Sequence, residues 1–445
     1  MDKKRTTAFV IASLMAVSML SACSGPSGNA GNASGNAAAS GGSADNASGS
    51  AIRLLNGKSE VDTQIKALAS AYEKETGQKV IVESIPAGVE VQPTLKGYYL
   101  ADQMPDIFVC EGSSFANWEG LLVDMSKEDW AGRTDAAYID KEYGTLGFPY
   151  TTEAIGLAYN ADILAKAGID PAGLTSPAAY EAAFKKLDSM RSELGLTAVS
   201  GYCAEDQNLG WSSGNHIFGA YIDSGLARDD TTYIDLLQDG GKIDTARFKD
   251  FASFIGLLQK YSDPALLVKG TYDDQVKGFA SGKYAFVTQG SWIGAILTGD
   301  DADAYKSAGS FKIGMAPYAF EDGMDTILTS APSWWAVCRE GNVDASLKFL
   351  QWCSEDAAQK IFVEDAGFVS PFKDCKYVAS DPFAQTIADH VTAGKTSDWH
   401  WQNMKEGLGT NALAPLFNQY AAGKLDTDGF VDAVAKASAD YYSVN

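Results

Sequence analysis

The stretch from Ser397 to Asn403 brings several groups capable of polar recognition into one short run. It holds the carboxylate of Asp398, the imidazole of His400, the indoles of Trp399 and Trp401, and two amides. A carboxylate accepts two hydroxyls, a neutral imidazole offers one donor and one acceptor, and an indole provides a flat apolar face. This set suits a ligand with hydroxyl rims and apolar C–H faces, and the alternative is an ordinary polar surface turn. We therefore take Asp398 and His400 as candidate ligand-binding residues.

Three further tryptophans stand at turns, where an indole can serve as a stacking platform. Trp211 lies in a polar segment punctuated by glycine, Trp292 follows Gly290, and Trp334 follows a proline-containing loop. Core packing is the competing interpretation for any tryptophan. Trp334 and Trp335 are adjacent on an extended segment and face opposite ways, so one of them should point toward a ligand, and the sequence does not decide which.

Strands and helices alternate in the part of the chain that precedes these tryptophans. We expect strands at 52–55, 79–82 and 106–110, separated by helices, the first of which ends at Gly77. This is the pattern of a parallel sheet with helices on its faces, whose ligands bind beyond the carboxyl ends of the strands. The loops after the first and third strands lie at such ends, so Lys58, Glu111 and Ser113 are candidate ligand-binding residues. The loop with Lys58 is not a phosphate loop, because Ile52 stands where the first glycine is required.

The N-terminus has the features of an export signal. Lys3, Lys4 and Arg5 precede an apolar run that ends at Leu20, so we expect a signal peptide over residues 1–22. Leu20-Ser21-Ala22-Cys23 resembles the bacterial lipobox, which implies that Cys23 becomes the mature N-terminus and carries lipid such as palmitate. The alternative is a plain secretory signal with a chance cysteine. Residues 23–50 are rich in Gly, Ala, Ser and Asn, and we expect them to form a flexible tether.

Composition disfavours several classes of function. A formal net charge of -22 argues against a nucleic-acid partner, because phosphates need a basic face. The three histidines lie far apart, and no H-E-x-x-H or C-x-x-C motif occurs, so we expect no metal site and no cofactor. The sequence contains neither a G-x-S-x-G nucleophile elbow nor a distinctive pair of carboxylates, so no motif indicates an enzyme. The roughly 395 residues after the tether exceed what one hydrophobic core usually organises, which predicts two lobes.

Several short motifs recur in a characteristic order. A turn, a β run at 154–159 and a helix opening at Asn160 carry the pairs Tyr143-Gly144, Pro149-Tyr150, Tyr159-Asn160 and Ala167-Gly168. Residues 279–292 then read Phe-x-x-Gly-Lys, an apolar strand and Gly-x-Trp. Together these motifs resemble the extracellular solute-binding proteins, of the family 1 type, that serve bacterial ABC sugar importers.

The resemblance implies an α/β, two-lobe fold of the periplasmic-binding-protein type (type II), with a ligand cleft between the lobes and several hinge crossings. It places residues 51–155 and 316–366 in lobe 1, and residues 156–315 and 367–445 in lobe 2. It also implies that the protein is a monomer and that it is not an enzyme.

The resemblance further implies a substrate-binding lipoprotein, anchored through Cys23 at the outer face of the cytoplasmic membrane. This protein would capture an oligosaccharide and deliver it to the transmembrane subunits of an ABC permease. Lys58 early in the chain and Asp398 and His400 late in it are similar to the galactose-binding end of raffinose-type receptors, which implies a galactosyl oligosaccharide. A polyamine or another small polar solute in the same fold, and a secreted glycoside hydrolase, are the alternatives.

Overall fold

The computed structural model describes residues 51–86, 89 and 91–444. The expected signal peptide, the lipid attachment at Cys23 and the tether at 23–50 lie outside these residues. Within the described ranges, no helix is both long enough and apolar enough to cross a membrane.

Lobe 1, as the name is used below, consists of the elements around a six-stranded sheet in the order β2-β1-β3-β12-β5-β4. β1 pairs in parallel with β2 and β3, as the alternating pattern predicts, and β12 pairs antiparallel with β3 and β5. Every residue of β3 and β12 is buried, as expected for strands covered on both faces. The strands are β1 (Ile52–Asn56), β2 (Val80–Ser84), β3 (Ile107–Cys110), β4 (Tyr138–Asp140), β5 (Gly144–Pro149) and β12 (Trp334–Val337).

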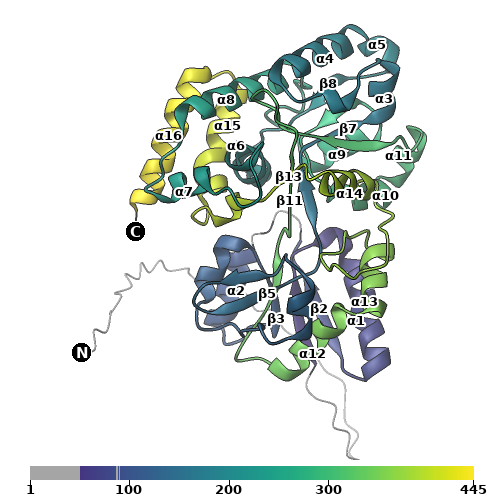
Figure 1. Cartoon of the computed structure of the whole chain (residues 1–445), viewed down its shortest axis with the longest axis vertical. Coiled ribbons are helices and arrows are strands. Elements are labelled where there is room, and N and C mark those ends of the chain that lie inside the picture. Colours follow the sequence, from purple (N-terminus) through teal and green to yellow (C-terminus); the bar gives the residue numbers. More distant parts are fainter. Residues whose placement is uncertain (1–50, 87–88, 90, 445) are drawn as a thin grey trace, which may run out of the picture. The chain divides into compact units, whose positions relative to one another are not determined.

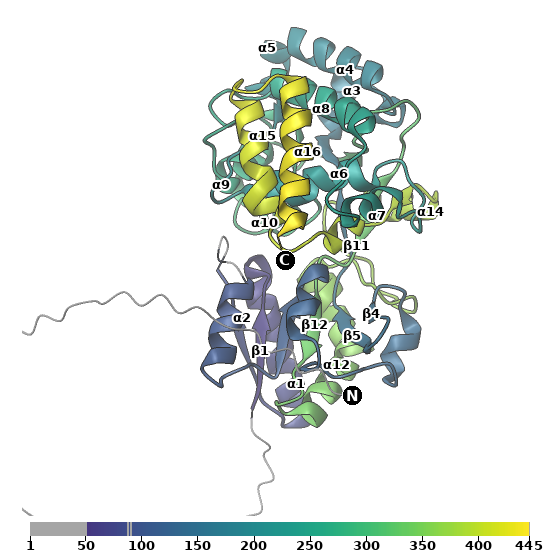
Figure 2. The same ribbon diagram turned by 90° about the vertical axis from the view of Figure 1, so that its left-hand side faces the viewer.

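Helices cover this sheet, and Figures 1 and 2 show α1, α2 and α12 beside it. α1 ends at Gly77, whose positive φ of 78° is readily adopted by glycine, so the helix stops where the sequence predicts. The helical segments are α1 (Asp62–Thr76), α2 (Val91–Leu100), α12 (Val343–Cys353), α13 (Asp356–Lys360), the 3-10 turns η1 (Ser59–Val61), η2 (Gly112–Trp118) and η3 (Asp129–Arg133), and the π-helical turn η6 (Ile361–Asp365).

Lobe 2 consists of the elements around a four-stranded sheet in the order β10-β7-β9-β8. Its strands are β7 (Leu157–Asn160), β8 (Ala198–Gly201), β9 (Tyr284–Val287) and β10 (Ile313–Ala316). The Asn160 side chain accepts from Ile163 N at 3.0 Å and so caps the helix that follows β7, which confirms the predicted strand-to-helix junction.

Many more helices surround this second sheet than the first (Figures 1 and 2). They are α3 (Ala161–Lys166), α4 (Pro177–Ser189), α5 (Arg191–Leu194), α6 (Phe218–Asp223), α7 (Thr232–Gln238), α8 (Thr245–Lys260), α9 (Tyr272–Ala280), α10 (Ile293–Thr298), α11 (Ala302–Ser307), α14 (Ala384–Thr392), α15 (Ala414–Ala421) and α16 (Thr427–Ser443). Shorter turns are the 3-10 turns η4 (Pro171–Gly173) and η7 (His400–Asn403) and the π-helical turns η5 (Ser212–Ile217) and η8 (Leu408–Leu413).

A three-stranded sheet, β13-β11-β6, is built from segments that pass between the lobes. β6 (Glu153–Ile155) connects β5 of lobe 1 to β7 of lobe 2, and β11 (Ile327–Ser330) connects β10 of lobe 2 to β12 of lobe 1. The two strands pair antiparallel, with Ser330 opposite Glu153 and Leu328 opposite Ile155. β13 (Thr396–Ser397) pairs in parallel with β11.

The third crossing follows η6, where Thr152 N donates to Val369 O at 2.8 Å. The predicted lobe boundaries at 155–156 and 366–367 stay predictions, and they lie close to these strands and this bridge. Tyr318, Phe320 and Met324 pack in the same hydrophobic core as lobe 2 residues. We therefore propose that the second boundary lies near β11 rather than at 316.

Candidate ligand-binding site

Four indoles from separate parts of lobe 2 meet around one imidazole. The ring of His216 has its centroid 4.7 Å from Trp292, 5.0 Å from Trp401, 5.2 Å from Trp211 and 6.0 Å from Trp399. Trp211 also lies 6.0 Å from Trp292, and Trp399 lies 5.7 Å from Trp401. We call these five residues the aromatic cluster. The structure thus brings together Trp211, Trp292 and the turn that contains His400.

The backbone that carries His216 is unusual, because η5 is a π-helical turn packed against a second π-helical turn, η8. π-helical turns are rare in proteins overall, and those that do occur are often found at functional sites. Their contact depends on glycine, since a Cβ built on Gly214 would lie 2.0 Å from the carbonyl oxygen of Gly409. The close approach of these two turns positions His216 among the four indoles.

Three buried polar atoms of the aromatic cluster have no hydrogen-bond partner within the protein. They are Nδ1 of His216 and the Nε1 atoms of Trp399 and Trp401. Leaving a buried donor or acceptor unsatisfied costs about 1–3 kcal/mol. Trp292 differs, because its Nε1 donates to Oε1 of Gln289 at 3.1 Å. The aromatic cluster therefore combines flat apolar faces with buried polar atoms that have no partner within the protein.

His216 is uncharged at neutral pH. Burial, together with the nearby charge of Lys58, lowers the pKa of His216 to about 3. A neutral imidazole offers either a donor or an acceptor at Nδ1, depending on its tautomer. This versatility suits hydroxyl groups, which both donate and accept.

A buried acid–imidazole pair supports the turn that carries the late tryptophans. His400 Nδ1 lies 2.8 Å from Oδ1 of Asp223, and Trp401 N donates to Oδ2 of the same carboxylate at 3.4 Å. Burial raises the pKa of Asp223 to about 6, and the hydrogen bond with Asp223 raises the pKa of His400. Asp223 thereby fixes the ring of His400 and the backbone of Trp401.

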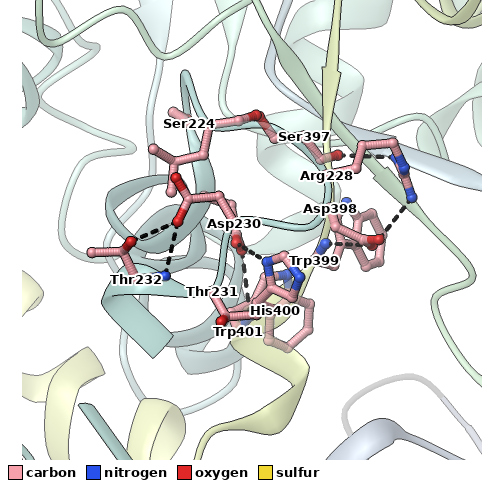
Figure 3. A network of polar contacts seen from close by, with 12 residues as sticks. Ser224, Arg228, Asp230, Thr231, Thr232, Ser397, Asp398, Trp399, His400 and Trp401 are labelled. Atoms are coloured by element: carbon pink, nitrogen blue, oxygen red, sulfur yellow. Dashed lines mark hydrogen bonds and ion pairs between the residues drawn. The ribbon is translucent and has the colours of Figure 1, made fainter. Parts of the chain in front are cut away.

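Asp398 points away from this pair toward a guanidinium, as Figure 3 shows. Its Oδ2 accepts from Nη2 of Arg228 at 2.8 Å, and its Oδ1 accepts from Trp399 N at 2.8 Å. The side chain is partly exposed. Asp398 lies next to the aromatic cluster in sequence, yet the contacts of its carboxylate are with Arg228 and the backbone.

The loop after β1 brings Lys58 of lobe 1 to the crossing strand β6. Lys58 Nζ forms a short ion pair with Oε1 of Glu153 and lies 3.1 Å from Oε1 of Glu60. The Lys58 and Glu153 side chains are only 11% and 8% exposed. Burial opposes the charge, but the two carboxylates raise the pKa of Lys58 well above its ordinary value. Lys58 is therefore a buried cation whose charge is matched by two acids.

The other predicted loop lies against the late turn. A Cβ built on Gly112 would lie 2.9 Å from the carbonyl oxygen of Gln402, so η2 and η7 are in close contact. Ser113 is half-buried within η2, and Glu111 is exposed at its N-terminal cap. The structure places both residues beside the 397–403 turn, and their role in binding stays a prediction.

Trp334 and Trp335 both lie in the core of lobe 1. Trp334 is 6% exposed, and its Nε1 donates to Ala136 O at 2.6 Å. Trp335 is fully buried and stacks on Tyr150, with ring centroids 4.8 Å apart. The two side chains face opposite ways, as expected, but both faces of this sheet are covered. The structure does not bring Trp334 into the aromatic cluster.

A small pocket adjoins Trp292 at the crossing strands. Its lining includes Glu60, Glu153 and Asp381, and its volume of about 30 Å³ has room for a water-sized molecule. Burial raises the pKa of Asp381 to about 7. Because this volume is far below the ~300 Å³ typical of ligand pockets, a larger ligand requires the surrounding groups to separate.

Sequence reasoning missed His216, Asp223 and Glu153 as functional candidates. His216 ends the glycine-punctuated segment that holds Trp211, and this proximity was an available signal. Asp223 and Glu153 carry no such signal, because their partners lie far away in the chain, at His400 and Lys58. Among the described residues, the cysteines are free thiols, and no group of three acidic, histidine or cysteine side chains is arranged to hold a metal.

Two α/β lobes joined by three chain crossings, with an aromatic and polar cluster near those crossings, define a binding protein for small solutes. The chain belongs to the bacterial extracellular solute-binding proteins, whose family profile matches residues 67–390.

Relatives agree with this assignment. The chain is 26% identical over 240 residues to the sn-glycerol-3-phosphate-binding periplasmic protein UgpB of Agrobacterium fabrum, a match that covers 52% of this chain. The chain spans about half (50%) of the length of that relative.

Solved structures show the same fold at low sequence identity. RafE in complex with raffinose superposes with a TM-score of 0.67 at 18% identity, covering 88% of this chain and 99% of its own. A sugar transporter of Bacillus licheniformis in complex with stachyose superposes with a TM-score of 0.68 at 14% identity, covering 89% and 100%. The fold is thus the two-lobe, type II architecture of periplasmic binding proteins, which confirms the fold expected from the sequence.

Proposed function

We propose that this protein is the substrate-binding lipoprotein of an ABC importer, and that it captures an oligosaccharide outside the cell and delivers it to the transmembrane subunits of a permease. The aromatic cluster is the observation that carries this proposal. Its indoles offer stacking faces for the C–H surfaces of sugar rings, while the unpaired atoms of His216, Trp399 and Trp401 offer bonds to hydroxyls.

A galactosyl oligosaccharide of the raffinose type is our specific proposal for the ligand. Structures of the same fold have been solved with raffinose and with stachyose, and the expected polar residues Lys58 and His400 both lie near the aromatic cluster. Lys58, Glu111, Ser113, Asp398 and His400 remain proposed ligand-binding residues, while the buried position of Trp334 makes a direct contact through its indole unfavourable.

Calorimetric titration with a panel of di- and trisaccharides tests the proposal directly. We expect raffinose or a related galactoside to bind with micromolar or tighter affinity and to be recovered unaltered. Products of hydrolysis would indicate the glycoside hydrolase alternative. Binding of spermidine with no response to any sugar would indicate the polyamine alternative.

Membrane attachment requires a separate experiment, because it depends on Cys23. We propose that the protein is a monomer anchored through a lipid on Cys23 at the outer face of the cytoplasmic membrane. Labelling of growing cells with radioactive palmitate is expected to mark the full-length protein and to fail with Cys23→Ala. Label incorporated equally by both forms would contradict this assignment.

A further inference from the structure

Each cation near the aromatic cluster is already held by carboxylates. Lys58 lies between Glu153 and Glu60, and its Nζ is 3.1 Å from the latter. The Lys58 and Glu153 side chains are almost completely buried, and solvent screening of the pair is therefore weak. The two carboxylates therefore cancel most of the electrostatic attraction that Lys58 would exert on an incoming anion.

Arg228, on the other side of the late turn, is occupied in the same way. Its Nη1 donates to O and Oγ1 of Thr329 at 2.9 and 2.8 Å, and its Nη2 donates to Asp398 at 2.8 Å. Figure 3 shows this guanidinium directed at Asp398 and the Ser397 backbone. Nη1 and Nη2 of Arg228 thus already have hydrogen-bond partners within the protein.

The net charge of the ionised side chains around the aromatic cluster is therefore negative. Glu60, Glu153 and Asp398 outnumber Lys58 and Arg228 by three to two, and the further acid Asp223 is paired with His400. The imidazole at the centre of the cluster is neutral. An anion buried here would lose its hydration and would gain no unpaired cation.

We infer that this site selects against negatively charged ligands, and that Glu153 and Glu60 determine this selectivity by neutralising Lys58. The ligand is then an uncharged or positively charged solute, in contrast to the phosphate ester in the name of the relative from Agrobacterium fabrum. The location of the site, but not its charge preference, rests on the proposed function.

Two disaccharides that differ at C6 provide the first test. α-(1→4)-Galactobiose and α-(1→4)-digalacturonate share one linkage, and C6 of each ring is a neutral hydroxymethyl carbon in the first and a carboxylate carbon in the second. We expect digalacturonate to bind at least about tenfold more weakly than galactobiose, with no binding of sn-glycerol 3-phosphate at millimolar concentration. Binding of digalacturonate or glycerol phosphate as strong as that of the neutral sugar would overturn the inference.

Spermidine, as a fourth ligand, separates failure of the inference from failure of the proposed function. If spermidine binds and no sugar does, the oligosaccharide proposal is wrong while the exclusion of anions stands. If none of the four ligands binds, the location of the site is wrong, and the inference falls with it.

Removing the acidic partners of Lys58 provides the second test. The single variant Glu60→Gln keeps the buried ion pair of Lys58 with Glu153. The double variant Glu60→Gln, Glu153→Gln leaves Lys58 without either carboxylate partner. We expect the affinity for digalacturonate relative to galactobiose to rise stepwise, by about tenfold or more in the double variant. Glu73→Gln on the exposed face of α1 is the matched control and should leave this ratio unchanged.

Thermal unfolding of each variant establishes that it is folded before its affinities are compared. Should the double variant fail to fold, the single Glu60→Gln variant still decides the question. An affinity ratio equal to that of the parent protein in a folded Glu60→Gln variant would refute the role assigned to the acids.

Discussion

Replacing Trp292 with alanine tests the aromatic cluster most directly. The indole of Trp292 packs 4.7 Å from the ring of His216 and 6.0 Å from Trp211, and its Nε1 donates to Gln289 at 3.1 Å. A stacked aromatic contact contributes about 0.5–1.5 kcal/mol beyond burial of its area. Loss of one sugar-stacking face therefore predicts about tenfold weaker binding of raffinose, because tenfold corresponds to about 1.4 kcal/mol.

Trp352 offers a closely matched control on α12 of lobe 1. Its indole is also partly buried, packs 5.2 Å from the ring of Tyr72, and donates from Nε1 to Glu75 at 3.0 Å. Trp352→Ala removes the same side chain from a helix that contributes no residue to the aromatic cluster. We expect it to lower thermal stability and to leave raffinose affinity within about twofold of the parent protein.

Calorimetry with raffinose, paired with thermal unfolding of each protein, measures both effects. The reasoning is refuted if Trp292→Ala binds as tightly as the parent protein. It is equally refuted if the two alanine variants lose the same affinity, since the effect would then report general destabilisation rather than a lost stacking face.

Three further substitutions test the groups that support the cluster. Gln289→Leu removes the acceptor of the neighbouring indole N–H, so we expect raffinose affinity and the unfolding midpoint to fall together; an unchanged affinity would contradict this. Gly214→Ala places a Cβ 2.0 Å from a carbonyl oxygen, which should cost about 1–3 kcal/mol in urea unfolding, whereas Gly97→Ala, with open space around it, should not destabilise. Because Asp223 raises the pKa of His400, the charged imidazole contributes stability that is lost as pH rises from the ordinary histidine pKa of about 6.5 through the raised value, while Asp223 itself, with a pKa of about 6, takes up a proton at lower pH. Asp223→Asn should flatten this decline between pH 6 and 9, and parallel stability curves for the two proteins would disprove the linkage.

Much of lobe 1 follows from local sequence pattern. The first three strands and the helix ending at Gly77 were expected, because apolar periodicity and a glycine stop are local signals. The insertion of β12 between β3 and β5 was not expected. Its partners precede it by more than 180 positions in the chain, and pairing over such a separation leaves no local trace.

The candidate site was predictable only in part, for a similar reason. Trp211 and Trp292 were chosen because they stand at turns, and their ring centroids lie 6.0 Å apart in one cluster. His216 became central only through the contact of two π-helical turns, which depends on packing around Gly214. Trp334 was misleading, because alternation along a strand identifies two faces but does not reveal that both are covered.

The antiparallel pairing of β6 with β11 constrains how the two halves of the protein can move. Two unpaired connecting segments would allow the lobes to twist in any direction, whereas β6 and β11 are paired along their edges by backbone hydrogen bonds. Such a ribbon flexes across its flat face far more easily than within its plane. We therefore expect relative motion of the two lobes to bend this ribbon across its flat face rather than to twist it.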